Sequence, residues 1–232
     1  MPQAPAVIGN LVESTMGRPA RVLGVHEPAA GFLELDLRAA APPGGWHPGH
    51  EIQFRVAPTL GRRYTVHAVS GPERIAILVT IHAAAPGTTW IRRLRAGTET
   101  TVLAARHRPL RATGTRRLYL GDGSALGTID AYARPGDDSV VAVEVPPDAV
   151  SPLAARWPRY RCLPAAAAPG DALQSWLARA ADAGELAGLD GAVLLGHAQS
   201  IQRQRRALID AQILPRRAIT TRPYWATGKE GL

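Results

Sequence analysis

The first half of the chain alternates apolar and polar residues over short stretches. In Gly31–Arg38, leucines at every second position share one face and charged residues take most of the other. A period of two is the pattern of a half-buried strand. Three further stretches are predicted as strands: Glu51–Val56, Tyr64–Val69 and the nearly continuous apolar run Arg74–His82. Turns rich in Pro and Gly separate these strands, so the pattern predicts a small antiparallel β-barrel.

One helix is expected to interrupt the strands. It begins near Pro86 and runs through Trp90 and Ile91 to Leu94. Proline suits the first turn of a helix, because the amide at that position has no partner within the helix in any case.

The pattern changes after about Arg111, where strand-like and helix-like stretches alternate. The expected strands are Arg117–Leu120, Ser139–Val145 and Gly191–Leu195. Three helices are expected: one after the turn Gly121–Ser124, one that begins at a cap formed by Asp171, and one over Ser200–Gln212. The stretch Pro164–Gly170 is expected to be a loop. Such alternation predicts a parallel sheet covered by helices. We therefore expect two domains, a barrel over residues 1–112 and an α/β domain over residues 113–232.

Charge narrows the class of protein only a little. The 232 residues carry a formal net charge of +8, almost all of it from arginine, because Lys229 is the only lysine. Two interpretations stay open: a solvated surface in a chain rich in Ala, Gly and Pro, or a cleft for an acidic ligand. The arginines at 203, 205 and 206 are expected on the solvated face of one helix, so no nucleic-acid partner is expected.

Cysteine and histidine usage argues against a metal centre. Cys162 is the only cysteine, which excludes an internal disulfide and a multi-thiolate site. His47 and His50 have the spacing of a ligand pair, but no further ligand completes the set. No stretch resembles a signal peptide or reaches the roughly 20 apolar residues of a membrane span. We expect a cytoplasmic monomer without a membrane partner.

Arg62-Arg63-Tyr64-Thr65 is the first group of residues with specific chemistry. Residues two apart on a strand point to the same face, so Arg62 and Tyr64 can address one ligand together. An ordinary strand with a Tyr-Thr-Val core is the alternative interpretation of these residues.

Other segments support a ligand site. His82, Gly87, Thr88, Thr89 and Trp90 lie around the predicted start of the helix, where exposed amides and hydroxyls can bind an anion. Arg95–Thr98, Leu118–Ile129, Val193–Asp210 and Ile219–Gly228 follow in order. From about Arg21 to the end, this series resembles the siderophore-interacting proteins, which have the ferredoxin-reductase fold.

The resemblance implies FAD in the barrel domain and reduction of a ferric siderophore, with iron leaving as Fe(II). It implies that Arg62 binds the diphosphate, that Tyr64 packs on the flavin and that Thr65 is the catalytic residue beside flavin N5. The remaining expected cofactor contacts are His67, His82, Gly87, Thr88, Thr89, Trp90, Gly121 and Asp122. Lys229 and Arg222 are the candidates for binding the anionic chelate, and a solvated lysine is the alternative for the first. The electron donor is NADPH, NADH or a protein such as ferredoxin.

Three positions depart from that resemblance. His67 stands where a second arginine is usual, and Gly123 and His197 stand where acidic residues are usual. A neutral imidazole is a poorer partner for a diphosphate than a guanidinium, so FAD is held less tightly, or His67 binds it only when protonated. The missing carboxylates either suit a more anionic ligand or mark a protein that does not use NAD(P)H.

Two rival functions remain open at this point. One is a flavin reductase domain that passes electrons to a partner oxygenase. The other is a degenerate, non-enzymatic protein that binds a ligand through a basic cleft.

Overall fold

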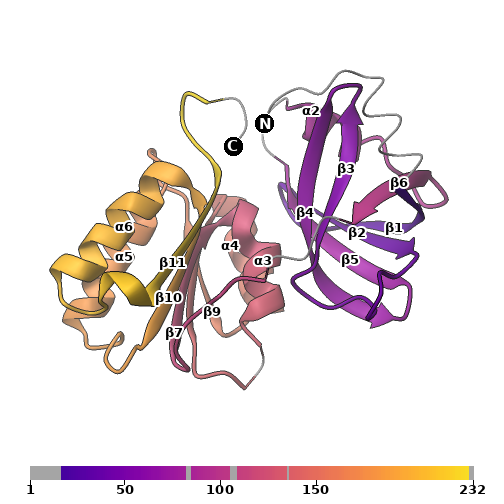
Figure 1. Cartoon of the computed structure of the whole chain (residues 1–232). Coiled ribbons are helices and arrows are strands. Elements are labelled where there is room, and N and C mark those ends of the chain that lie inside the picture. Colours follow the sequence, from indigo (N-terminus) through magenta and orange to yellow (C-terminus); the bar gives the residue numbers. More distant parts are fainter. Residues whose placement is uncertain (1–16, 82–84, 105–108, 135, 230–232) are drawn as a thin grey trace. The chain divides into compact units, whose positions relative to one another are not determined.

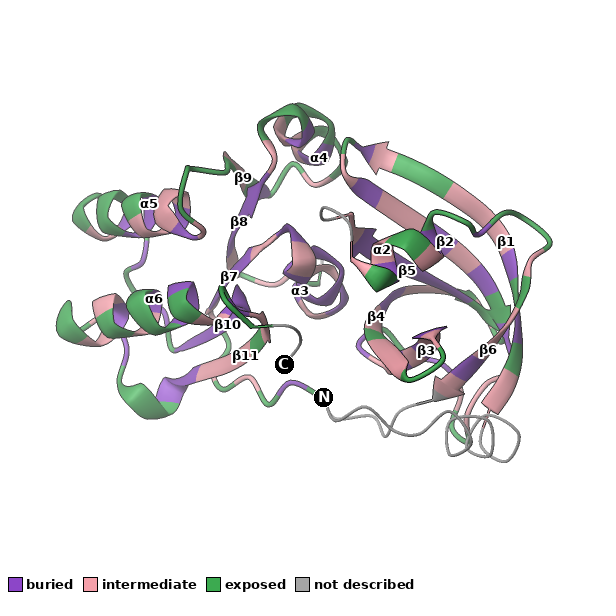
Figure 2. Ribbon diagram, turned by 90° about the horizontal axis from the view of Figure 1, so that it is seen from above, coloured by how far each residue is buried: buried purple, intermediate pink, exposed green. Residues whose placement is uncertain are grey.

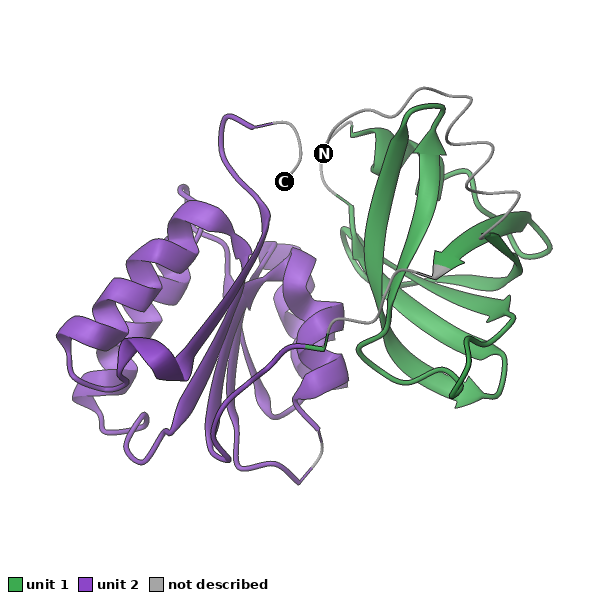
Figure 3. Ribbon diagram, in the orientation of Figure 1, with its two compact units in different colours: residues 1–109 green, residues 110–232 purple. Residues whose placement is uncertain are grey.

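The computed structural model describes residues 17–81, 85–104, 109–134 and 136–229. The chain divides into two compact units, residues 1–109 and 110–232 (Figure 3).

Unit 1 is a closed antiparallel barrel with the strand order β1-β2-β5-β4-β3-β6 (Figure 1). Its strands are β1 (Gly17–Ala29), β2 (Phe32–Ala39), β3 (Glu51–Ala57), β4 (Leu60–Gly71), β5 (Arg74–Thr80) and β6 (Glu99–Ala104). The predicted antiparallel barrel is therefore confirmed. β1 and β6, which close the barrel, were not predicted as strands.

The barrel core gathers around a buried aromatic side chain. Phe54, on β3, is fully buried, and its ring centroid lies 5.9 Å from that of Tyr64 and 4.9 Å from that of Trp90. Trp90 belongs to the short helix α2 (Pro86–Ile91), whose last residue, Ile91, is also fully buried. Phe54 therefore joins three elements, the strands β3 and β4 and the helix α2.

Strand β4 contains an irregularity at His67. Val66 pairs with Ile77 of β5, whereas Ala68 pairs with Ala76, so β4 carries one extra residue, His67, between two consecutive residues of β5. Such a β-bulge redirects the side chain at the extra position. Val66 and His67 are both buried, Val66 in the barrel core and His67 against Glu34, which lies on the face of β2 opposite the core residues Leu35 and Leu37.

Unit 2 is a parallel sheet with the strand order β11-β10-β7-β8-β9. Its strands are β7 (Arg117–Asp122), β8 (Val140–Val145), β9 (Tyr160–Pro164), β10 (Gly191–His197) and β11 (Ile219–Trp225). Its helices are α3 (Leu126–Tyr132), α4 (Val150–Arg156), α5 (Asp171–Asp182) and α6 (Ala198–Asp210), with short 3-10 turns η1 (Gly123–Ala125), η2 (Pro147–Ala149) and η3 (Arg216–Ala218). The predicted parallel sheet covered by helices is confirmed.

The helices cover both faces of this sheet. α5 and α6 lie on one face and α3 and α4 on the other (Figure 1). β10, between two neighbours, is buried along its whole length (Figure 2). Leu173, Trp176 and Leu177 of α5 pack with the sheet residues Leu118 and Leu194 in one core. The predicted apolar face of this helix is thus the one that meets the sheet.

Several boundaries that were predicted from the sequence differ from those in the structure. The first helix ends at Ile91 rather than Leu94. Gly121 and Asp122 are the last residues of β7, because they still pair with β8 and the turn begins only at Gly123. Asp171 does not cap α5; it is the first helical residue after Gly170, and its carboxylate pairs instead with Arg203 at 2.7 Å. His82 lies outside the described residues. Within the described part of the chain, no helix is long and apolar enough to cross a bilayer.

Replacing Phe54 with Ala should destabilise unit 1 by about 3–5 kcal/mol, because a fully buried aromatic ring leaves a cavity. The measurement is urea unfolding followed by tryptophan fluorescence, to which Trp90 contributes. Phe54→Leu is the matched control and should cost less, since it keeps most of the apolar volume. Equal unfolding midpoints for Phe54→Ala and the unmodified protein would contradict a core centred on Phe54.

Candidate functional site

Arg62, Tyr64 and Gly87 meet on the barrel, although they come from two separate segments. Arg62 and Tyr64 are both half-buried on β4, and Arg63 between them is exposed. A Cβ atom built on Gly87 would lie 3.3 Å from the hydroxyl oxygen of Tyr64 and 3.4 Å from Cγ of Arg62. The start of α2 therefore lies directly against both side chains. The two motifs identified in the sequence form one surface.

The protonation state of Tyr64 suits an anionic ligand. Burial of the phenol raises the pKa of Tyr64 to about 12, and the nearby Arg62 opposes that rise. The side chain therefore stays neutral at every physiological pH and keeps its hydroxyl proton. Because no phenolate forms here, the charge that this pair presents to a ligand is the guanidinium of Arg62.

The other predicted barrel contacts lie close by, with different surroundings. Thr88 is half-buried and Thr89 is exposed, and the Thr89 amide donates to the carbonyl of Ala85 at 2.9 Å. Trp90 packs toward the core against Phe54, so it positions α2. Thr65 is half-buried and opposes Glu51 across the β3–β4 pair.

His67 turns away from the surface that Arg62 and Tyr64 form. Its side chain is 2% exposed, and its Nε2 lies 2.8 Å from a carboxylate oxygen of Glu34, on β2. Glu34 alternates along β2 with the core residues Leu35 and Leu37, so the imidazole that contacts it lies on the side of the barrel wall that faces away from the core. The predicted contact between His67 and FAD stays a prediction, and in this conformation the imidazole faces Glu34.

In unit 2, Asp122 links the ends of three strands. Its Oδ2 accepts hydrogen bonds from the backbone amide of His197 at 2.8 Å and from the indole Nε1 of Trp225 at 2.9 Å. Its Oδ1 accepts from the amide of Ser124 at 2.9 Å and from the hydroxyl of the same residue. The carboxylate thus joins β7 to β10 and β11. Sequence reasoning assigned Asp122 to a cofactor, but these four bonds are all to the protein.

His197 continues this network. Ser200 donates its hydroxyl proton to the carbonyl of Pro169 at 2.6 Å, so its oxygen accepts from His197 Nδ1 at 2.7 Å. Nε2 of His197 then accepts from the hydroxyl of Thr227 at 2.9 Å, and the ring lies 4.3 Å from that of Trp225. A neutral imidazole with its proton on Nδ1 satisfies every one of these contacts. Burial lowers the pKa of His197 from its ordinary value of 6.5, and Asp122 opposes that shift.

Two glycines at this edge have packing roles. A Cβ on Gly121 would lie 2.7 Å from Cβ of Ala125, so this glycine allows η1 to approach β7 closely. Gly196 has a φ of +99°, and a Cβ there would lie 2.4 Å from Asp122 Oδ2. Only glycine fits such a conformation and such a close approach.

Sequence reasoning missed Glu144, the last-but-one residue of β8. It is 5% exposed, and its two carboxylate oxygens accept from the amides of Gly170, Ala172 and Leu173 at 2.9, 3.1 and 3.3 Å. Glu144 therefore caps the N-terminus of α5, the role that was predicted for Asp171. The available signal was a single acidic residue within an apolar strand, Val140–Val145.

The two predicted chelate-binding residues lie in the last part of the chain. Arg222 is half-buried on β11, opposite Leu195 of β10. Lys229 is exposed, and its backbone forms an isolated bridge with Ala226. Among the described residues, no group of three or more His, Cys, Asp or Glu side chains is arranged to hold a metal ion.

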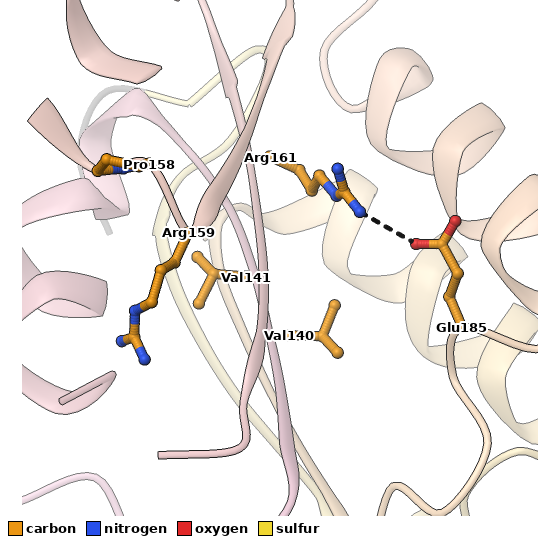
Figure 4. A pocket seen from close by; sticks show the side chains of 6 residues that line it. All are labelled: Val140, Val141, Pro158, Arg159, Arg161 and Glu185. Carbon is orange, nitrogen blue, oxygen red and sulfur yellow. Dashed lines mark ion pairs between the residues drawn. The ribbon is translucent and has the colours of Figure 1, made fainter. Parts of the chain in front are cut away.

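A pocket of about 290 Å³ lies at the opposite, amino-terminal edge of the sheet. It is lined by the first residues of β8 and by Arg159 and Arg161, and Arg161 forms an ion pair of 3.7 Å with Glu185 (Figure 4). Both members of the pair are exposed, so it is worth little energetically. This pocket contains none of the residues predicted from the sequence.

No family model and no curated protein matches the sequence. Solved structures do match the fold. A siderophore-interacting protein from Acinetobacter baumannii is 15% identical with a TM-score of 0.74, and the match covers 92% of each chain. The siderophore-interacting protein SipS from Aeromonas hydrophila is 16% identical with a TM-score of 0.69, covering 93% of this chain and 94% of that one. A ferredoxin reductase of carbazole 1,9a-dioxygenase is 18% identical with a TM-score of 0.64, covering 90% of this chain and 67% of that one.

These comparisons confirm the predicted fold, that of ferredoxin reductases, and the structural resemblance to siderophore-interacting proteins. Identities of this size establish the fold alone.

Acid should destabilise unit 2 through His197. Because the folded-state pKa lies below 6.5, the unfolded chain binds more protons than the folded chain just below pH 6.5. Stability is therefore fully present above about pH 6.5 and falls as the pH drops toward the folded-state pKa. Thermal unfolding of the protein and of His197→Gln, between pH 5 and pH 7.5, measures the effect. The variant should lose part of the acid-side slope, and identical slopes would contradict this role.

Proposed function

We propose that this protein is an FAD-dependent reductase of ferric siderophores, which releases iron as Fe(II). The observation that supports it most is the meeting of Arg62, Tyr64 and Gly87 on a barrel of the ferredoxin-reductase fold. The electron donor is NAD(P)H or a reduced protein. In this proposal residues 1–112 form the FAD-binding domain and residues 113–232 the domain that resembles NAD(P)-binding domains.

The barrel residues fit an FAD. Arg62 offers the planar, permanently charged fork that matches a phosphate oxygen pair. Gly87 has no side chain, and this allows the start of α2 to lie directly against Arg62 and Tyr64. Thr88 and Thr89 carry hydroxyls at the start of α2, and Ala85 before them has no side-chain group to cap the helix. The neutral phenol of Tyr64 offers an aromatic ring without a repelling charge.

When bound, FAD supplies the electron transfer, taking electrons from a donor and passing them singly to ferric iron. The chain's own residues bind, orient and tune it. Arg62 would neutralise the charge of the diphosphate, Tyr64 would provide a packing surface for the flavin, and Thr65 would offer a hydroxyl or an amide to it. Iron belongs to the substrate. Lys229 and Arg222 are the cations proposed to attract an anionic chelate.

A second function has support from one comparison. The likeness to a ferredoxin reductase of carbazole 1,9a-dioxygenase favours a flavin reductase that serves a partner oxygenase. Such a protein would reduce a protein acceptor and ignore ferric siderophores. A degenerate member without flavin would bind a ferric chelate and catalyse nothing.

The purified protein should be yellow and should release FAD on denaturation. Under anaerobic conditions, dithionite should bleach the flavin spectrum, and a stoichiometric ferric hydroxamate or catecholate should restore it, with an Fe(II) chelator reporting the product. Colourless protein that does not bind added FAD contradicts the flavin site. Bound FAD that, once reduced, is not reoxidised by any ferric chelate contradicts the substrate and favours the oxygenase partner.

Arg62→Ala should weaken FAD binding about 10- to 100-fold, the range expected for the loss of a charge-assisted hydrogen bond. Arg63→Ala is the matched control. It removes the same charge from the neighbouring, exposed position, where the guanidinium contacts Gln53 at 3.4 Å. Titration of apoprotein with FAD, followed by flavin fluorescence, measures both dissociation constants. Equal losses in the two variants would mean that only overall charge matters.

A further inference from the structure

The strand order of unit 2 defines where a dinucleotide would bind. The chain runs from β7 outward to β8 and β9, then returns to β10 and β11 on the other side of β7. The order therefore reverses between β7 and β10. Dinucleotides bind open sheets of this order at the carboxyl ends of the strands around that reversal, with the diphosphate on backbone amides at helix N-termini.

Asp122 accepts hydrogen bonds from the backbone amides that lie where the strand order reverses. The Ser124 amide, at the start of η1, and the His197 amide, just before α6, both donate to its carboxylate. Gly196 lies so close to the Asp122 carboxylate that a Cβ atom on this glycine would collide with Oδ2 of Asp122. A protein carboxylate thus lies where these amides would otherwise face a phosphate.

The segment after β11 covers the first turn of α6. Thr227 bonds to His197 through its hydroxyl at 2.9 Å. The side chain of Gln199 donates to the Thr227 carbonyl at 3.3 Å and accepts from the Thr227 amide at 3.4 Å. Trp225, the last residue of β11, precedes this segment and donates to Asp122. A ligand bound at the start of α6 would have to displace this segment after β11.

The ends of β8 and β9 are also filled. β8 continues into Pro146-Pro147, two residues without an amide proton. The start of α5 carries the carboxylate of Glu144, bonded to three amides. All three donors are backbone N–H groups, and both oxygens of the Glu144 side chain accept from them.

A cation on this side, Arg203, is also engaged. Arg203 of α6 donates from Nη1 to Asp171 at 2.7 Å and from Nη2 to the carbonyl of Pro169 at 2.7 Å. Its guanidinium therefore joins α6 to the start of α5. A diphosphate would have to compete with Asp171 for it.

We propose that Asp122 and Glu144 are built-in anions that exclude the diphosphate of NAD(P)H from unit 2. For the reductase proposed above, on which this inference rests, the electron donor is then a one-electron carrier protein with an acidic surface. Each reduced carrier gives one electron, and each Fe(III) takes one to become Fe(II), so the exchange balances without a hydride. The net charge of +8 complements an acidic carrier.

Two kinds of measurement test the exclusion separately from the reductase function. The first uses apoprotein: NADP⁺, NAD⁺ and pyrophosphate at millimolar concentration should leave its Tm unchanged, because a ligand raises Tm only if it binds the folded state. A saturable rise in Tm with NADP⁺ or NAD⁺ overturns the exclusion, whether or not the protein reduces iron.

The second measurement uses FAD-loaded protein under anaerobic conditions. NADH and NADPH should bleach the flavin no faster than they bleach free FAD, whereas a reduced acidic [2Fe–2S] ferredoxin should bleach it quickly. The ferredoxin rate should fall steeply with added salt, as expected for opposite charges. Saturable bleaching by either nucleotide, or no bleaching by ferredoxin, overturns the donor assignment. Failure of ferric chelates to reoxidise a dithionite-reduced flavin would instead count against the proposed function.

Opening the site should create anion binding. Glu144→Ala frees three amides at the start of α5, so inorganic phosphate or pyrophosphate should raise the Tm of this variant in a saturable manner. Asp148→Ala is the matched control, because it removes the same charge from an exposed position without freeing those amides. Equal responses of the two variants overturn the role of Glu144. If Glu144→Ala does not fold, Glu144→Gln keeps the shape without the charge and should show the same response more weakly.

Discussion

The carboxylate of Asp122 is the constraint around which unit 2 is organised. It accepts hydrogen bonds from the Ser124 amide, the His197 amide and the Trp225 indole, so it ties the ends of β7, β10 and β11 together. Each buried N–H that lost this partner would cost about 1–3 kcal/mol. The bond to Trp225 also positions the indole against the ring of His197, and the same ring bonds to Thr227. The chain beyond β11 is therefore held by an interaction that begins at the end of β7.

In unit 1 the corresponding constraint is the bulge in β4. Up to Tyr64 the strand alternates, which places Arg62 and Tyr64 together beside Gly87. The extra residue at His67 interrupts that alternation, and its imidazole contacts Glu34 on the side of the barrel wall that faces away from the core. Burying such a pair is tolerable because each group partners the other, whereas either one alone would be costly. The bulge thus limits the proposed ligand surface on β4 to the residues before Val66.

The parts of the fold that could be predicted are those encoded by local periodicity. β2 and β3 alternate cleanly, and the apolar face of α5 is continuous, so these elements were found with small boundary errors. β1 escaped detection because its burial is irregular and Pro19, Gly24 and Pro28 interrupt its pattern. β11 contains Pro223, which an edge strand tolerates but which weakens a sequence-based assignment. The capping of α5 could not be predicted locally, because Glu144 lies 26 residues before the Gly170 amide that it accepts from.

The contacts of Asp122 and Glu144 change the interpretation of Gly123 and His197. In the sequence alone, these two residues stand where acidic residues are usual, which suggests a more positive charge at the carboxyl edge of the sheet. In the fold, however, Asp122 and Glu144 are already present at that edge, and both influence the imidazole of His197. A carboxylate at position 197 would add a third negative charge beside these two, where charges interact strongly because little water screens them. A neutral imidazole avoids that repulsion and supplies the bonds to Ser200 and Thr227. The histidine at position 197 therefore fits a sheet edge whose amides already bind the carboxylates of Asp122 and Glu144, rather than one that is open to an anionic ligand.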